Sequence, residues 1–173
     1  MVKAIVVMGV SGCGKTTVAR LLAQRLGWRF AEADEFHSEA SIAKMRAGVP
    51  LTDGDRWPWL AAIAAHIDES RATDSPVVVT CSALKRHYRD VIIGSRPDVA
   101  LVYLKGDFAT IERRLRARSH AYMPVSLLKS QFDALEEPGG EEKPITLDIR
   151  KRPEELVDAL QLDPGLRRDD RAK

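Results

Sequence analysis

A phosphate-binding loop stands near the start of the chain. Residues 8–20, MGVSGCGKTTVAR, hold two glycines, a lysine and a threonine at the spacing G-x-x-x-x-G-K-T. Glycine lets backbone N–H groups come close to phosphate oxygens, the lysine reaches the β- and γ-phosphates, and the threonine hydroxyl can ligate Mg²⁺. We therefore predict that nucleotide phosphates and Mg²⁺ are bound here. The predicted loop residues are Gly9, Ser11, Gly12, Cys13, Gly14, Lys15, Thr16 and Thr17.

Carboxylates that support the metal are expected elsewhere in the chain. The β-branched run at 77–81 does not end in aspartate, so the usual metal-supporting carboxylate is missing there, and no N-K-x-D motif for guanine selection is present. The nearest acidic pair is Glu32 and Asp34. Residues two apart on an extended chain point the same way, so both are expected to face the loop. We predict that Glu32 supports the metal through water and that Asp34 accepts a hydroxyl proton.

Cys13 lies inside the loop, just before the expected helix. Helix N-termini lower the pKa of a thiol. We therefore expect Cys13 to be sensitive to thiol modification and to be protected by bound ATP.

The elements that position these residues alternate between strands and helices. Apolar runs at 4–8, 77–81, 99–104 and 145–149 predict strands, with a shorter one at 30–31. Helical spacing follows from residue 14 to Gly27, then over 38–47, from about 55, after Asp107, and over 126–135 and 153–160. The strands are continuous apolar runs, which is typical of a parallel sheet covered on both faces, so the fold class is α/β.

Composition narrows the classes of function. The chain has 173 residues, 45% of them hydrophobic, and a net charge of +2, which gives no support for nucleic-acid binding. No apolar run is long enough to span a membrane, and no signal peptide is evident. Two cysteines do not make a disulfide framework, so we expect free thiols and a cytoplasmic location. One domain is predicted over residues 1–162, followed by a polar, flexible tail at 163–173.

Further along the chain, three stretches are more characteristic of a particular protein family than the phosphate loop is. They are DEFHSEASIAKMRAGVPLTDGDRWPWL at 34–60, CSALKRHYRD at 81–90 and LKGDF at 104–108. With these stretches the chain closely resembles the gluconate kinases of the thermoresistant gluconokinase family, from the phosphate loop to SQFDALEEP at 130–138. Two departures stand out: Glu32-Ala33-Asp34 replaces the family's Asp-Gly-Asp, and His120-Ala121-Tyr122 replaces Gly-His-Phe. We therefore assign His120 no role.

The resemblance implies a three-layer P-loop kinase fold similar to shikimate kinase and the nucleoside monophosphate kinases. It implies a five-stranded parallel sheet with helices on both faces, a helical substrate-binding insertion at about 37–72 and a lid at about 116–126. The implied activity is transfer of the γ-phosphoryl group of ATP to the 6-hydroxyl of D-gluconate, with Mg²⁺, usually by a homodimer.

Gluconate has one carboxylate and several hydroxyls, so its site needs cations at one end and a base at the other. Arg56 can grip both carboxylate oxygens, Lys85 can add charge or bind a hydroxyl, and His37 can bind hydroxyls. Trp57 and Trp59 are expected to pack in the core or the insertion and are given no role in sugar stacking.

The lid is expected to supply arginines to the nucleotide. Arg114 and Arg118 are four apart, hence on one helical face, and match family positions. They can stabilise the transferring phosphoryl group, Arg118 as a catalytic residue and Arg114 as a nucleotide ligand, and which of them meets adenine stays open. Two alternatives remain at this point: another small-molecule kinase of the same fold, such as a shikimate kinase, and a nucleotide-binding regulatory module.

Overall fold

The sheet has the strand order β2-β3-β1-β4-β5, with every neighbouring pair parallel. A computed structural model describes residues 1–117, 125–162 and 166, and five strands lie in these ranges. Their bounds are β1 Ala4–Met8, β2 Arg29–Glu32, β3 Val77–Thr80, β4 Val99–Lys105 and β5 Ile145–Asp148. The five-stranded parallel sheet is confirmed, and each strand begins within two residues of the predicted run.

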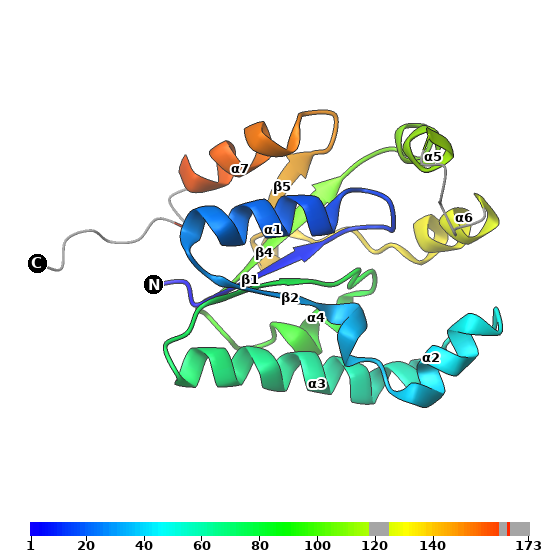
Figure 1. Cartoon of the computed structure of the whole chain (residues 1–173), viewed down its shortest axis with the longest axis horizontal. Coiled ribbons are helices and arrows are strands. Elements are labelled where there is room, and N and C mark those ends of the chain that lie inside the picture. The colour runs from blue at the N-terminus through cyan, green and yellow to red at the C-terminus, as the bar shows by residue number, and fades with distance from the viewer. Residues whose placement is uncertain (118–124, 163–165, 167–173) are drawn as a thin grey trace, which may run out of the picture.

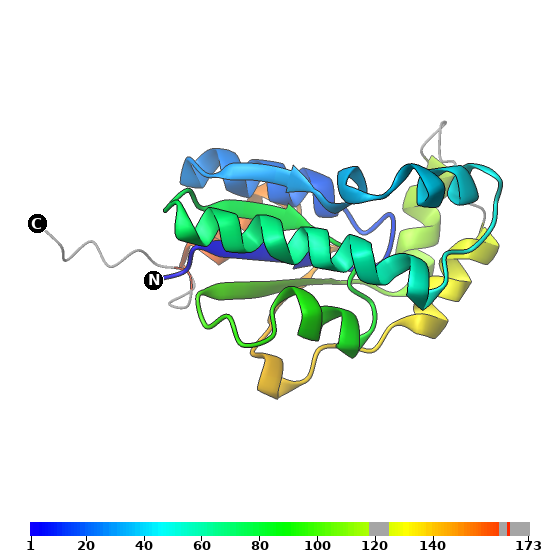
Figure 2. The ribbon, with the colours of Figure 1, turned by 90° about the horizontal axis from the view of Figure 1, so that it is seen from below.

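Helices cover both faces of this sheet (Figure 1). One face carries α1 (Lys15–Leu26) and α7 (Pro153–Leu162), and the other carries α3 (Asp53–Ala72) and α4 (Arg86–Ile92). Three further helices, α2 (Glu39–Arg46), α5 (Phe108–Ala117) and α6 (Val125–Ala134), gather at one end of the molecule (Figure 2). Short 3₁₀ helices, η1 and η2, span Ala33–Phe36 and Gly140–Glu142.

Local sequence signals explain where these helices begin and end. Gly27 ends α1 in the left-handed conformation at φ 65°, and its N–H returns to carbonyls of the last turn. The Ser38 hydroxyl caps α2 by accepting from the Ser41 N–H at 3.1 Å. At the start of α3, Thr52 and Asp55 form a reciprocal capping box. The insertion helices are thus set by their own termini.

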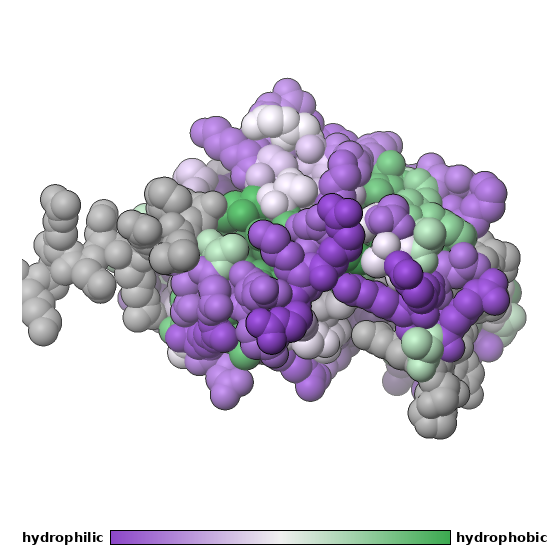
Figure 3. Space-filling model, turned by 90° about the horizontal axis from the view of Figure 1, so that it is seen from above, coloured by the Kyte–Doolittle hydropathy of each residue, from purple (hydrophilic) through white to green (hydrophobic). Residues whose placement is uncertain are grey.

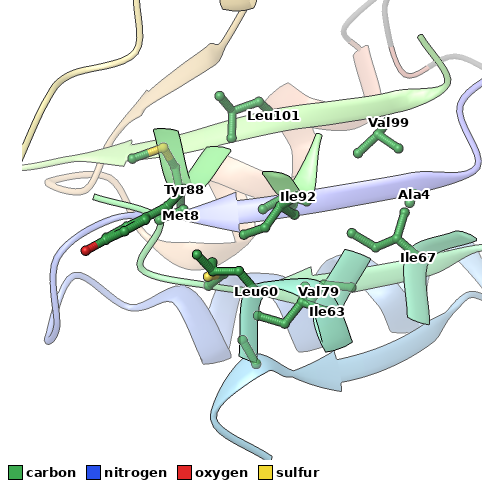
Figure 4. Packing of buried hydrophobic residues seen from close by; sticks show 14 of the residues in the cluster. Ala4, Met8, Leu60, Ile63, Ile67, Val79, Tyr88, Ile92, Val99 and Leu101 are labelled. Carbon is green, nitrogen blue, oxygen red and sulfur yellow. The ribbon is translucent and has the colours of Figure 1, made fainter. Parts of the chain in front are cut away.

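Two hydrophobic cores hold the layers together, one on each face of the sheet. Figure 4 shows the first, where Leu60, Ile63 and Ile67 of α3 and Ile92 of α4 pack against the strands. The second joins α1, α5 and α7 to the opposite face. Strand residues such as Ile5 and Val6 are fully buried because alternate side chains enter the two cores. This is why the strands are continuous apolar runs.

On the face with α1 and α7 the surface is mostly hydrophilic, with hydrophobic colour at the end where α5 and α6 lie (Figure 3). Leu127 of α6 is among the exposed large apolar residues. Within the described ranges, none of the helices is both long and apolar enough to cross a bilayer. Apart from Leu166, the predicted tail at 163–173 lies outside the described residues, as does most of the predicted lid.

Candidate active site

The phosphate loop lies between β1 and α1, at the carboxyl end of the central strand. Gly12 and Gly14 take φ values of 83° and 101°, which side-chain-bearing residues rarely adopt. Gly12 also lies tightly against α5, since a Cβ there would come within 2.7 Å of Leu115 Cδ2. Both glycines are therefore required by this loop, and the predicted strand–loop–helix context is confirmed. In open α/β sheets, ligands bind at this edge.

Lys15 curls back over the loop at the first position of α1. Its Nζ donates to the carbonyl oxygens of Gly9, at 3.0 Å, and Val10, at 3.2 Å. The N–H groups of the first helical turn have no partner within the helix and carry the positive end of its dipole. Amine and backbone donors thus surround one position, an arrangement that suits a phosphate group.

Glu32 meets the loop directly. Its Oε1 accepts from the Thr16 hydroxyl at 2.6 Å and from the Thr80 hydroxyl at 3.0 Å. Thr80 is buried at the end of β3, where the usual aspartate is missing, and the carboxylate that it contacts belongs to the neighbouring strand β2. The Thr16 proton is directed at Glu32, which leaves the hydroxyl lone pairs free for a cation. Across the described ranges, no three His, Cys, Asp or Glu side chains cluster as a ready metal site.

The backbone at Asp34 differs from the predicted one. We expected an extended chain through Glu32 and Asp34, and this was wrong: β2 ends at Glu32, and η1 begins at Ala33. That Asp34 faces the phosphate loop stays a prediction. Asp34 is exposed on that turn. The negative charge of Asp34 raises the pKa of Cys81, which Lys15 lowers, and raises the pKa of His37, which Arg56 lowers. Asp34 thus lies on η1, two residues after the end of β2 and three residues before His37.

His37 lies flat against Trp59. The two rings stack with centroids 4.4 Å apart and planes 10° from parallel, and the Trp59 Nε1 donates to the Ala33 carbonyl at 2.7 Å. Burial lowers the pKa of His37, against the opposing effect of Asp34. The ring is therefore neutral near pH 7 and can both donate to and accept from hydroxyls. Trp59 is buried as expected, which makes it the support of His37.

Arg56 and Lys85 meet around a carboxylate that the sequence analysis did not single out. Asp53 Oδ1 lies 3.8 Å from Arg56 Nη1 and 3.7 Å from Lys85 Nζ. It also accepts from the Tyr88 hydroxyl at 2.5 Å, and this bond is the main cause of its lowered pKa. The His87 Nε2 lies 3.7 Å from its other oxygen. The two predicted cations are thus brought together, with Asp53 and Tyr88 between them.

The loop that carries Lys85 is held by a buried arginine. Arg89 of α4 is 2% exposed, and its guanidinium donates to the carbonyls of Ala83 and Leu84. Two further bonds join Arg89 to Glu142, at 2.6 and 3.0 Å. Spacing does contain a faint signal for the missed residues, because Asp53 precedes Arg56 by three positions and Tyr88 follows Lys85 by three. Their meeting across the fold is not visible in the sequence.

The arginines of the expected lid are only partly described. Arg114 of α5 donates from Nη2 to the Ile149 carbonyl, which lies just after β5. Its charge also lowers the pKa of Cys13 in the phosphate loop, to a small extent. Arg118, the predicted catalytic arginine, and His120 lie outside the described residues. Trp57 is 41% exposed and packs edge-on against Tyr88, so it belongs to the insertion surface and not to the core.

The expectation that the helix N-terminus lowers the pKa of Cys13 was wrong. Burial raises the pKa of Cys13, and this effect outweighs the lowering by Lys15 and by nearby backbone N–H groups. The side chain is 2% exposed and fills the space beside Gly9, where an added Cβ would lie 2.6 Å from Sγ. Cys13 is therefore a packing residue with a protonated thiol. The Cys81 thiol is also buried, which raises its pKa to about 12.

Comparison with known proteins gives a consistent picture. The family model described as "AAA domain" matches residues 5–138. A gluconokinase of Gluconobacter oxydans is 44% identical, with 90% of this chain and 88% of that protein covered. A thermoresistant gluconokinase of Escherichia coli is 41% identical, with 88% and 87% covered.

Solved structures agree with these relatives. A gluconokinase from Sinorhizobium meliloti superposes with a TM-score of 0.83 at 43% identity, covering 94% of this chain and 90% of that one. A shikimate kinase from Acinetobacter baumannii reaches 0.57 at 19% identity, with 94% and 93% covered, which shows a common fold.

Proposed function

The chain belongs to the gluconokinase family, and on that premise we propose that it transfers the γ-phosphoryl group of ATP to the 6-hydroxyl of D-gluconate. The observation that carries the proposal is the identity of 41–44% to named gluconokinases over about nine tenths of the chain. The site geometry supports it, because the phosphate loop lies at the carboxyl end of β1, and Arg56 and Lys85, two cations suited to a carboxylate, meet around Asp53.

The nucleotide half consists of the phosphate loop and α1. Lys15 and the first-turn N–H groups bind the β- and γ-phosphates, where negative charge develops during transfer. Mg²⁺ fits here because the Thr16 hydroxyl is oriented by Glu32 and keeps its lone pairs for a cation. When bound, the ion neutralises charge on the phosphates. Glu32 orients the Thr16 hydroxyl and supports the ion through water.

The acceptor half holds gluconate at its two ends. Arg56 and Lys85 bind the carboxylate, with Asp53 limiting their combined charge to that of one cation. Neutral His37 binds sugar hydroxyls. Asp34 orients the 6-hydroxyl and takes its proton while the oxygen forms a bond to the γ-phosphorus and the bond to the β-phosphate oxygen breaks. The products are 6-phosphogluconate and ADP.

The remaining assignments extend this proposal. Arg118 stabilises the phosphoryl group in transfer, and Arg114 binds the nucleotide near the loop after β5. Residues 37–72, which include α2 and α3, form the substrate-binding insertion, and residues 116–126 form the lid of a single domain at 1–162. A homodimer is part of the proposal on the strength of the family resemblance, and a cytoplasmic location on the strength of the two free cysteines. Shared fold with shikimate kinases at 19% identity does not identify an acceptor.

A coupled assay of ADP release tests the proposal. With Mg-ATP, ADP release is expected to depend on gluconate and to stay at background with shikimate or with no acceptor. Release that responds to shikimate alone would favour the kinase alternative. Nucleotide binding without release under any of these conditions would favour a regulatory module.

A further inference from the structure

A glutamine that is distant in the sequence is hydrogen-bonded to the phosphate loop. Gln131 lies on α6, 120 residues after Ser11. Its Oε1 accepts from the Ser11 backbone N–H at 2.7 Å, and its Nε2 donates to the Ser11 hydroxyl oxygen at 2.8 Å. The side-chain amide of Gln131 therefore forms one hydrogen bond with the backbone N–H of Ser11 and another with its hydroxyl.

The neighbouring loop residue is held by the other helix at this end. Gly12 packs against Leu115 and Ile111 of α5 so closely that a Cβ would lie 2.7–3.2 Å from their side chains. Phe108 and Phe132 join α5 to α6 by an edge-to-face contact with centroids 5.6 Å apart. Figure 1 shows α5 and α6 beside the turn between β1 and α1. Consecutive loop residues are thus fixed by a packed pair of helices.

The bonds to Gln131 divide the donors of the loop into two sets. The Ser11 N–H is already bonded to a side chain, whereas the N–H groups of the first turn of α1 have no partner within the helix. Fixing Ser11 before the nucleotide arrives removes part of the ordering cost that binding would otherwise incur.

We propose that Gln131 is a positioning residue for the nucleotide: it holds Ser11 so that the phosphate loop is preformed. The proposal rests on the nucleotide-binding half of the proposed function and is independent of the acceptor. It requires an amide in particular, since only an amide side chain of this length both accepts from the backbone N–H and donates to the hydroxyl. Methionine has a similar length and shape and offers neither bond.

Direct binding of a non-hydrolysable ATP analogue, measured by calorimetry without gluconate, tests this role. Gln131→Met is expected to raise the Kd about tenfold, the effect of losing one to two neutral hydrogen bonds. The matched control is Lys129→Met on the same helix, which removes only an exposed pair with Asp133. That control is expected to bind as the parent does. Failure of gluconate phosphorylation in the parent would leave these binding constants, and hence this test, unaffected.

A double-mutant cycle with Ser11→Ala makes the test specific. Ser11→Ala removes the hydroxyl but keeps the backbone N–H, so Gln131→Met should cost less in that background than in the parent. Gln131→Ala serves as a second variant if the methionine disturbs packing, with thermal unfolding as the check on the fold. A Kd within about twofold of the parent in a folded Gln131 variant overturns the proposal, as does an effect that is the same size with and without the Ser11 hydroxyl.

Discussion

The Thr16 hydroxyl donates to Glu32 Oε1 at 2.6 Å, which links the phosphate loop to the end of the second strand. Because the proton points at the carboxylate, the oxygen lone pairs of Thr16 are available to a cation. Thr80 holds the same carboxylate oxygen from below at 3.0 Å. Glu32 is thus fixed by two hydroxyls, and its charge lies next to the proposed Mg²⁺ position.

Glu32→Gln should weaken the response to Mg²⁺. The amide oxygen can still accept from Thr16, but the negative charge is lost, so we expect about a tenfold fall in activity at low Mg²⁺, partly restored at high Mg²⁺. Titration of Mg²⁺ at saturating ATP measures this. Glu35→Gln, an exposed carboxylate on the adjacent turn, is the control. An equal deficit at every Mg²⁺ concentration would contradict the assignment.

Cys13 should resist thiol reagents in the folded protein. Burial raises the pKa of Cys13 above that of an ordinary cysteine, so the thiol stays protonated at pH 7. Because the thiolate is the reactive form, alkylation at pH 7 should be slow with or without ATP. Mass spectrometry of alkylated protein, native and unfolded, gives the rates. Rapid labelling of native Cys13 that ATP blocks would restore the original expectation of a reactive thiol.

Arg56→Ala should raise the KM for gluconate and leave the KM for ATP almost unchanged. Loss of a charge-assisted bond to a carboxylate costs about 1.5–3 kcal/mol, which corresponds to roughly ten- to a hundred-fold. Steady-state kinetics with each substrate varied in turn separates the two KM values. Arg46→Ala, an exposed arginine at the end of α2, is the matched control. A parallel loss of ATP affinity would mean that Arg56 serves the fold or the nucleotide.

Asp34→Asn should lower kcat while ATP affinity stays the same. The amide keeps the size of the carboxylate but takes no proton, and a general base contributes typically about 10²–10⁴-fold. Since phosphoryl transfer is often loose, orientation of the hydroxyl can outweigh basicity, and the loss would then lie at the low end. Single-turnover rates with saturating gluconate measure the step. Turnover within a factor of about three of the parent would remove Asp34 from the mechanism.

The sequence predicted the sheet well because its strands are buried on both faces. Continuous runs such as residues 4–8 and 77–80 are apolar for that reason, and Gly27 ends the first helix by a local conformational rule. The prediction of an extended backbone at Asp34 was wrong. Nothing in Glu32-Ala33-Asp34 interrupts an extended pattern, and the change to a 3₁₀ turn at Ala33 is set by the fold around it, including the bond from Trp59 to the Ala33 carbonyl.

The sequence analysis did not predict the contacts between residues far apart in the chain. Asp53 meets Tyr88 across 35 positions, Glu32 meets Thr80 across 48, and Ser11 meets Gln131 across 120. Residue type and spacing predict groups able to do chemistry on one element, such as Lys15, Thr16 and Arg56. Which side chain from another element shares the same space follows only from the packing of the whole domain.

The most direct measurement of the central claim is the identity of the product. The protein is incubated with Mg-ATP and gluconate, and phosphorus–proton correlation NMR locates the new phosphate ester. The account predicts one product, with phosphorus coupled to the protons of carbon 6, formed in equal amount to ADP. Phosphate on another carbon, or ADP released with inorganic phosphate in place of an ester, would contradict it.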